Sequence, residues 1–339
     1  MDTAKKRLAI TMGDAAGIGP EVIVRAWADP RVHQCSRPVV LGHPDIMCQA
    51  VRLLDAKLGV IEVDKDFDQV MPDTIPCLRV GSDDVLAVPH GSVDALTGQA
   101  AYEALIRAID ETLAGRFDGI VTAPLSKAAL HAAGHFYPGH TELLAERCGV
   151  TDFAMMLYLP PEELPNSVAG LGVVHVTLHM ALSEVFANLS TAAILEKCHL
   201  AQRVMHEGFG LESPRIGVCA LNPHGGESGL FGDEETRIIA PAVEQAQAAG
   251  ISVTGPFPTD TLMVRARDGE FDAIVAMYHD QGHIALKLLG MHRAVNITLG
   301  LPIIRTSVAH GTAFDRAWQA TAESTGMVAA ITTAAKLAK

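Results

Sequence analysis

The sequence is poor in aromatic residues and carries fewer basic than acidic side chains. Phe, Trp and Tyr make up 5% of its 339 residues, which argues against the aromatic platforms on which single-stranded nucleic acids stack. Lys and Arg number 26 against 39 Asp and Glu, a net charge of −13 at pH 7. That sign disfavours binding to phosphate backbones and to anionic membrane surfaces. We therefore expect neither nucleic acid nor membrane among the partners.

Long apolar runs and paired cysteines are also missing. No apolar stretch reaches the roughly 18–20 residues that cross a bilayer. After the basic residues 5–7, the run 8–12 is shorter than the about 7–15 residues of a signal-peptide core. The six cysteines form no Cys-x-x-Cys pair, so neither a disulfide framework nor a cysteine-based zinc site is predicted. The sequence thus predicts a cytoplasmic protein with reduced thiols.

Length and hydrophobicity instead indicate a folded α/β protein. With 339 residues and 49% hydrophobic residues, the chain can form two domains with cores of their own. Short apolar runs alternate with longer helical patterns, and most runs are continuous, as in strands buried on both faces. We predict largely parallel sheets covered by helices on both faces. The strands are expected at 8–12, 39–41, 119–123, 173–178, 216–221, 273–278, 295–298 and 303–307, and the helices at 94–113, 127–133, 141–148, 182–207, 234–249 and 313–338.

Three of the 15 histidines follow three of these strands. His179 comes after 173–178, His224 after 216–221 and His279 after 273–278. Ligands of open α/β sheets bind beyond the carboxyl ends of the strands. Three imidazoles converging there suit Zn²⁺, Co²⁺ or Ni²⁺ and leave positions open for a substrate. The alternative is that each histidine is an ordinary hydrogen-bonded loop residue.

Other residues indicate an anionic ligand. His140 and Thr141 open a helix, whose free N–H groups attract anions, although Thr141 acting only as an N-cap explains the pattern equally well. Lys287 follows His279 by eight residues. Arg305 lies within an apolar strand, where a charge needs a partner; that partner is either a bound carboxylate or phosphate, or a buried Asp or Glu. The glycine-rich residues 13–21 lack a GxGxxG motif, so a dinucleotide fold of that kind is not supported.

Taken together, these segments resemble the 4-hydroxythreonine-4-phosphate dehydrogenase family, and the resemblance covers nearly the whole chain. It implies two α/β/α domains related in fold to isocitrate and isopropylmalate dehydrogenases, with the active site in the interdomain cleft at a dimer interface. The expected domains are residues 1–130 with 305–339, and residues 131–304. The motifs that carry the resemblance are TMGD at 11–14, GIGPE at 17–21, TAPLSK at 122–127, YPGHTE at 137–142, LNPH at 221–224, YHDQG at 278–282, VNIT at 295–298 and IRTS at 304–307.

The resemblance also implies roles for particular residues. One divalent metal ion per site (Zn²⁺, Co²⁺ or Mg²⁺) is expected on three histidines, one of which reaches in from the partner subunit of a homodimer: His179, His224 and His279. The expected substrate contacts are His140, Thr141, Lys287, Asn296 and Arg305. The expected catalytic groups are Asp260, Asp280 and Lys287, the last as proton donor or carboxylate partner. The expected cofactor loop contains His310, Gly311, Thr312 and Asp315.

The implied reaction is an NAD-dependent oxidation, with NADP as the alternative cofactor. Hydride leaves the carbon that bears the 3-hydroxyl of a phosphorylated four-carbon acid, and the resulting 3-keto acid loses CO₂. Ala15 replaces the proline usual in the first loop, and residues 231–235, 282–284 and 313–318 look closer to a paralogous branch that acts on 4-phosphothreonate or 4-phosphoerythronate. The alternatives are a metal-dependent hydrolase using the three histidines and a non-catalytic protein that binds a phosphorylated ligand.

Overall fold

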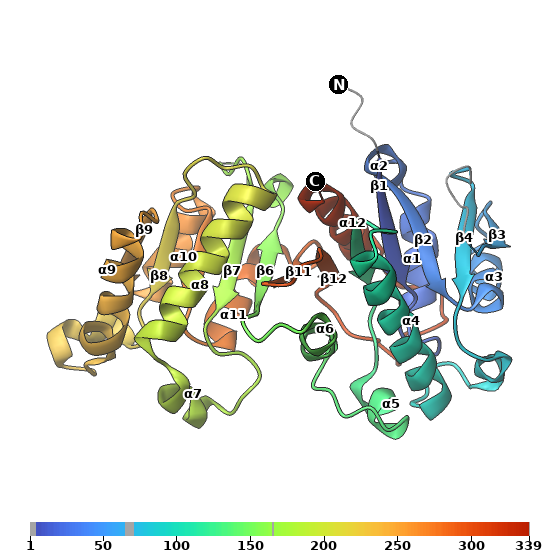
Figure 1. Ribbon diagram of the computed structural model, residues 1–339, viewed down its shortest axis with the longest axis horizontal. Helices are drawn as coiled ribbons and strands as arrows, with labels where there is room; N and C mark the ends of the chain where they lie inside the picture. Colours follow the sequence, from blue (N-terminus) through green and yellow to red (C-terminus); the bar gives the residue numbers. More distant parts are fainter. Residues whose placement is uncertain (1–4, 65–70, 165, 339) are drawn as a thin grey trace. The chain divides into compact units, whose positions relative to one another are not determined.

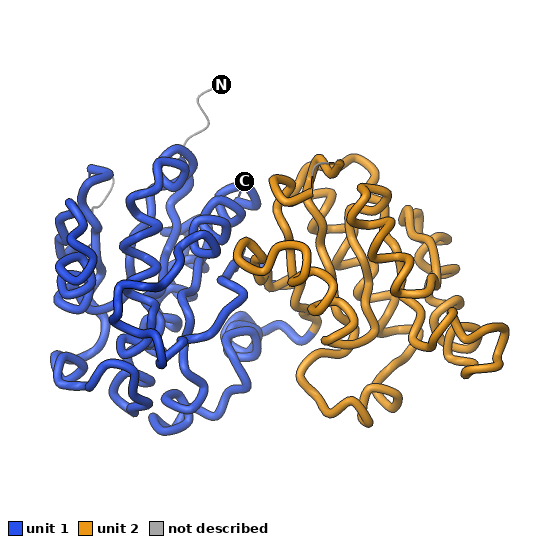
Figure 2. The backbone as a smooth tube through the Cα atoms, turned by 180° about the vertical axis from the view of Figure 1, so that it is seen from behind, with its two compact units in different colours: residues 1–151, 301–339 blue, residues 152–300 orange. Residues whose placement is uncertain are grey.

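The computed structural model describes residues 5–64, 71–164 and 166–338. Its chain forms two compact units, residues 1–151 with 301–339 (unit 1) and residues 152–300 (unit 2) (Figure 2). The expected boundary at 130/131 falls inside the helix α5 (Lys127–Ala132). Residues 131–151 belong to unit 1 because the helix α6 (His140–Cys148) packs Leu143 and Leu144 into the core of that unit.

Unit 1 contains a six-stranded sheet in the order β3-β4-β2-β1-β5-β12, and its strand pairs are parallel. The strands are β1 (Lys6–Thr11), β2 (Ser36–Gly42), β3 (Gly59–Glu62), β4 (Thr74–Arg79), β5 (Gly119–Thr122) and β12 (Arg305–Val308). Residues of β1, β2 and β5 are almost all buried, as expected for parallel strands covered on both faces.

Helices cover the two faces of this sheet (Figure 1). α4 (Ala95–Leu113) packs on β1, β2 and β5 and contacts α6. The other helices contact one another and the sheet: α1 (Gly19–Trp27), α2 (Pro30–Cys35), α3 (Pro44–Leu53) and α12 (Thr325–Leu337). The expected helix at 94–113 is confirmed, because Asp94 caps α4 by accepting a hydrogen bond from the Leu96 N–H at 2.7 Å.

Unit 2 contains a mixed sheet in the order β11-β6-β7-β10-β8-β9. Its strands are β6 (Ala154–Leu159), β7 (Leu171–His175), β8 (Ile216–Cys219), β9 (Val253–Phe257), β10 (Ala273–Ala276) and β11 (Val295–Leu299). β6 is antiparallel to both of its neighbours, and the other pairs are parallel. The helices are α7 (Leu182–Asn188), α8 (Thr191–Arg203), α9 (Ala240–Ala248), α10 (Thr259–Arg267) and α11 (His279–Gly290), and Figure 1 shows α8 in front of the strands and α10 behind them.

The eight expected strands are all present, but several other elements differ from the prediction. The strands β3, β4, β6 and β9 and the helices α1, α2, α3, α10 and α11 are not among the expected elements. The expected helix 182–207 is interrupted at Leu189 and Ser190, because the Ser190 hydroxyl caps a new helix by accepting from the Ala193 N–H. The expected helix 313–338 is wrong in its first half, where Ala313, Trp318 and Ala320 have positive φ angles, which helical residues do not adopt.

None of the helices in the described ranges combines the length and the apolar character that crossing a bilayer requires.

Candidate active site

The three histidines predicted to follow strands lie just beyond the strand ends at one edge of the unit 2 sheet. β7, β10 and β8 are adjacent and parallel, so their carboxyl ends meet at the same edge. His179 follows β7, His224 follows β8 and His279 begins α11 directly after β10. The prediction of their shared position therefore holds in the fold of this unit.

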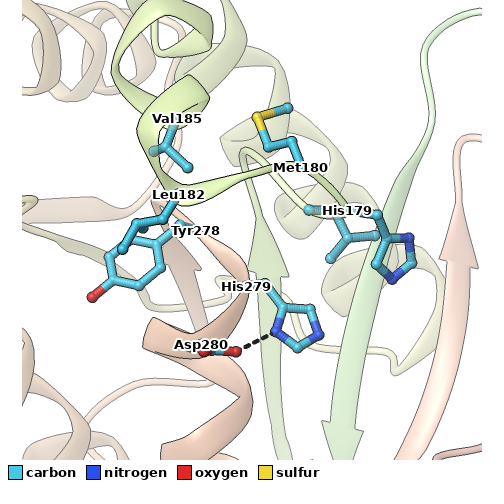
Figure 3. Close-up of a pocket in the computed structure, with 8 residues that line it drawn as sticks. His179, Met180, Leu182, Val185, Tyr278, His279 and Asp280 are labelled. Carbon is cyan, nitrogen blue, oxygen red and sulfur yellow. Dashed lines mark hydrogen bonds and ion pairs between the residues drawn. The ribbon is translucent and has the colours of Figure 1, made fainter.

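His179 and His279 also lie close together in space (Figure 3). Their ring centroids are 6.0 Å apart. Both line a cavity of about 560 Å³ whose remaining wall is mostly apolar: Leu178, Met180, Leu182, Val185, Tyr278 and Asp280. The two imidazoles thus supply nitrogen atoms to a cavity that can hold a small molecule.

Asp280 orients the His279 imidazole. Its Oδ1 lies 2.6 Å from Nδ1 of His279, and a carboxylate accepts the hydrogen bond, so Nδ1 carries the proton. The other ring nitrogen, Nε2, then presents its lone pair. A carboxylate paired with a histidine in this way is the usual support of a metal-binding imidazole.

The geometry of His179 and His279 fits two ligands of one metal ion. Nitrogen atoms at about 2.0–2.1 Å from an ion place two ring centroids roughly 4.5–5.5 Å apart, so a modest rotation of the exposed His179 ring from the observed 6.0 Å suffices. The third expected ligand is not brought to this pair. Within residues 5–64, 71–164 and 166–338, no group of three or more His, Cys, Asp or Glu side chains is arranged so that it could hold a metal ion.

His224 lies in an exposed turn with unusual backbone geometry. Five successive residues from His224 to Ser228 have positive φ angles. The base of the turn is held by the buried carboxylate of Glu235, which accepts hydrogen bonds from the backbone N–H groups of Leu221 at 2.8 Å and Asn222 at 2.7 Å. These hydrogen bonds lower the pKa of Glu235 against the opposing effect of its burial. Sequence reasoning missed Glu235, although it lies in a segment singled out there.

Gln281 ties the ends of neighbouring strands together. Its Oε1 accepts from the Met277 N–H at 2.7 Å, and its Nε2 donates to the Ala220 carbonyl at 2.7 Å and to the Thr259 hydroxyl at 2.9 Å. Asp260, one of the expected catalytic acids, follows at the start of α10, where its carboxylate is exposed and accepts from the Thr261 N–H.

Lys287 and Asn296 lie in unit 2 at different depths of the fold. Lys287 is four residues after His283 on α11, so the two side chains are neighbours on the helix surface, and its ammonium group is close enough to His283 to lower the pKa of that imidazole. Asn296 lies on β11 opposite Leu157 of β6 and is half-buried. Lys287 therefore lies near His283, which in turn stacks on His279.

Two histidines to which the sequence assigned no role lie buried next to His279. Burial lowers the pKa of His175 to about 4 and that of His283 to about 3, so both are neutral imidazoles at pH 7. The signal that could have found His283 is its spacing of four from His279 on a helix. It was missed because α11 itself was not predicted.

The expected anion-binding residues of unit 1 also gather in one place. Arg305, at the start of β12, is buried and donates from Nη2 to the Thr122 hydroxyl at 2.7 Å. Its burial lowers its pKa to about 9, an effect that the carboxylate of Glu142 opposes. Burial, and then the charges of Arg305 and Lys127, hold the pKa of His140 well below its usual value. The cluster therefore contains two cations, a neutral imidazole and the acidic partner considered for Arg305.

Thr141 is buried in the first turn of α6 but is not its N-cap. The helix begins at His140, and the N-cap is Gly139, whose extended backbone offers no side chain for capping. The expectation that Thr141 caps the helix is therefore wrong. Because no side chain caps this end, the N-terminal N–H groups of α6 suit an anion.

The expected cofactor loop follows β12 in unit 1. The Thr312 carbonyl accepts from the Ile18 N–H at 3.1 Å. Beyond the loop, the buried carboxylate of Glu21 accepts from the N–H groups of Trp318 at 2.6 Å and Ala320 at 2.8 Å. The loop that carries His310, Gly311, Thr312 and Asp315 is thus fastened to the glycine-rich first loop. The sequence assigned no role to Glu21 or Trp318, although both lie in segments that carry the resemblance or the departures from it.

Known proteins resemble this chain over its whole length. A family model described as Pyridoxal phosphate biosynthetic protein PdxA matches residues 34–334. The 4-hydroxythreonine-4-phosphate dehydrogenase of Desulforapulum autotrophicum is 45% identical over 334 residues, which cover 97% of this chain and 94% of the relative. The D-threonate 4-phosphate dehydrogenase of Salmonella typhimurium is 45% identical over 340 residues, which cover 98% and 99%. A crystal structure of a 4-hydroxythreonine-4-phosphate dehydrogenase from Klebsiella pneumoniae superposes with a TM-score of 0.87 at 42% identity and covers 99% of this chain and 100% of that one.

These findings, with the α/β fold, define an α/β dehydrogenase, an enzyme that oxidises a CH–OH group. They favour it over the hydrolase and the non-catalytic binding protein considered from the sequence. The chain belongs to the Pyridoxal phosphate biosynthetic protein PdxA family, and the family expected from the sequence motifs is confirmed.

Proposed function

We propose that this protein catalyses the NAD-dependent and divalent-metal-dependent oxidation and decarboxylation of a phosphorylated four-carbon 3-hydroxy acid. The observation that carries the proposal is the pair His179 and His279, which lines a cavity at the carboxyl edge of three parallel strands. The substrate class follows from relatives named for 4-hydroxythreonine-4-phosphate and for D-threonate 4-phosphate. The identity of 45% to each leaves the choice between the two to experiment.

Residues of both units have roles in the proposed reaction. In unit 1, Arg305, His140 and the N-terminal N–H groups of α6, where Thr141 lies, bind the phosphate or carboxylate. The loop His310, Gly311, Thr312 and Asp315 binds NAD, with NADP as the alternative. In unit 2, His179, His224 and His279 hold the cation, and Asn296 contacts the substrate. When bound, NAD would take up the hydride, and a divalent cation (Zn²⁺, Co²⁺ or Mg²⁺) held by these histidines would stabilise negative charge on the reacting oxygen.

The protons and electrons of the reaction balance with these residues. The 3-hydroxyl loses its proton to solvent or to the carboxylates Asp260 and Asp280 while hydride leaves the same carbon, which becomes a ketone. The bond to the carboxylate then breaks and leaves its electron pair on the neighbouring carbon. Lys287 donates the proton that this carbon takes up, because its ammonium group lies beside His283, one turn further along α11 than His279.

We further propose that the active protein is a homodimer whose active sites are shared. The support is an exposed apolar stripe formed by Ile284 and Leu288 of α11 and by Met291, its C-cap, which are 58%, 82% and 54% exposed. Spacings of three and four place these residues on one helix face, and such a face on a folded protein indicates an interface. A second copy offers the third imidazole that one chain does not bring to His179 and His279.

The cytoplasmic location expected from the sequence stays a prediction.

A side-by-side assay of NADH formation tests the proposal. The substrates are 4-phosphohydroxythreonine, 4-phosphothreonate and 4-phosphoerythronate, each with Zn²⁺, Co²⁺ or Mg²⁺. We expect NADH with at least one of them, and a loss of at least a hundredfold in His279→Ala. His199→Ala, which changes an exposed histidine of α8, is the matched control. Absence of NADH with every pair, or full activity in His279→Ala, contradicts the proposal.

A further inference from the structure

Two buried imidazoles lie next to His279 and are hydrogen-bonded to each other. His175 ends β7 and is 2% exposed, and His283 lies one turn beyond His279 on α11 and is 6% exposed. Buried polar groups need hydrogen-bond partners. Nδ1 of His283 lies 3.1 Å from Nε2 of His175, and Nδ1 of His175 lies 3.5 Å from the Met155 carbonyl oxygen. Both partners come from the interior of unit 2.

These contacts determine how the protons are arranged. A carbonyl only accepts, so Nδ1 of His175 is the donor toward Met155, and Nε2 of His175 then accepts from the Nδ1–H of His283. The His283 ring is therefore held in one orientation by the core and not by solvent. Such a buried hydrogen bond is rigid because breaking it leaves two polar groups unpaired.

The fixed His283 ring stacks face to face on His279. Their centroids are 3.8 Å apart, and their planes differ by 10°. The intervening Gly282 permits this packing, since a Cβ at that position would lie 2.5 Å from Cγ1 of Val173 and 2.6 Å from Nε2 of His175. The backbone of α11 can therefore approach β7 closely only with glycine at this position.

We propose that His283 is a positioning residue whose stacked ring holds the plane of the His279 imidazole in the orientation required to bind the divalent cation. This inference rests on the proposed metal-dependent function. Asp280 decides which nitrogen of His279 carries the lone pair, but its side chain is 68% exposed, so solvent competes for that contact. The buried stack is the firmer restraint on where the lone pair points.

Binding of Co²⁺ alone to the metal-free protein tests the proposal, with calorimetry as the readout. His283→Leu keeps a side chain of similar size but replaces the flat ring with a branched apolar chain, and we expect Co²⁺ affinity to fall at least tenfold, the range typical of lost support for a ligand. His283→Phe retains a ring that can stack, and its affinity should stay within about threefold of the unaltered protein. His199→Leu, on the exposed face of α8, is the control. Unaltered affinity in His283→Leu overturns the proposal, and so does an equal loss in His283→Phe, which would assign the effect to the buried hydrogen bond.

A second measurement does not require any His283 variant to fold. In metal-free protein labelled with ¹³C-histidine, the ring C–H resonances of His279, identified by their absence in His279→Ala, should be shifted upfield by the ring current of His283. Unshifted resonances overturn the proposal. If the unaltered protein binds no Co²⁺, the proposed metal dependence fails, and the NMR shift still decides whether the stack orients His279.

Discussion

The ionised carboxylate of Asp14 destabilises the folded state, and a single substitution can measure this effect. It lies in the first loop of unit 1 and is fully buried. Its Oδ1 accepts from the Ala16 N–H at 2.9 Å, whereas Oδ2 has no hydrogen-bond partner among the described residues. Burial raises the pKa of Asp14 from 3.8 to about 6. The folded state therefore prefers the protonated acid, and the ionised form destabilises it.

The magnitude follows from proton linkage. Above pH 6 Asp14 is ionised in the folded and in the unfolded chain, and the cost is fully present. As the pH falls below about 6, the folded chain binds a proton that the unfolded chain does not bind until about pH 3.8, so the free energy of unfolding rises. With 1.36 kcal/mol for each pKa unit, this relief amounts to about 1.4 kcal/mol between pH 8 and pH 5.

Asp14→Asn removes this titration. We compare the free energy of unfolding of the variant with that of the unaltered protein at each pH. The variant's advantage should be about 1.4 kcal/mol larger at pH 8 than at pH 5. Any pH-independent change in hydrogen bonding cancels in that comparison. Urea unfolding followed by tryptophan fluorescence suits the test, because Trp27 and Trp318 are the two tryptophans of the chain and both are buried in unit 1.

The control is Asp84→Asn, which changes an exposed carboxylate of the same unit. Solvent screens such a group, so its effect on stability should differ little between the two pH values. The reasoning about Asp14 is refuted if Asp14→Asn changes the free energy of unfolding by the same amount at pH 8 and at pH 5.

Three further predictions concern other parts of the molecule. Arg305→Lys keeps the charge but loses the planar fork of donors, so KM for the phosphorylated substrate should rise at least tenfold; an unaltered KM removes Arg305 from the site. Leu144→Ala in the core of unit 1 should lower the free energy of unfolding by about 2–5 kcal/mol in the tryptophan assay, and a loss below about 1 kcal/mol would contradict its core placement. Dialysis against a chelator should abolish NADH formation and added Co²⁺ should restore it, whereas undiminished activity would contradict the metal role.

Much of the fold could be predicted because its strands are continuous apolar runs. β1, β5, β8 and β10 were found from that pattern alone. β9 was missed because Gly255 and Pro256 interrupt its sequence, and both residues usually weaken a strand prediction. The length of a helix was harder to predict than its presence, since a serine cap or a run of positive φ angles ends a helix without changing the hydrophobic period.

The candidate site could be predicted in part. His179 and His279 were identified from their positions after strands, and the structure brings them together. His175 and His283 were missed because their importance depends on a stacked ring and a buried hydrogen bond, which no local pattern encodes. Glu21, Glu235 and Gln281 were missed for the same reason, since each acts through backbone groups distant in the sequence.

The sequence by itself determined the α/β class, the placement of histidines after strands and the family, because hydrophobic period and short motifs are local properties. Only the tertiary structure decided which of those histidines meet, that Glu142 accompanies Arg305 in its buried cluster, and that a core imidazole pair lies behind His279. The scarcity of basic residues in the sequence is therefore compatible with an anion site. A few cations suffice where burial strengthens their interaction with a ligand, and burial is a property of the folded chain.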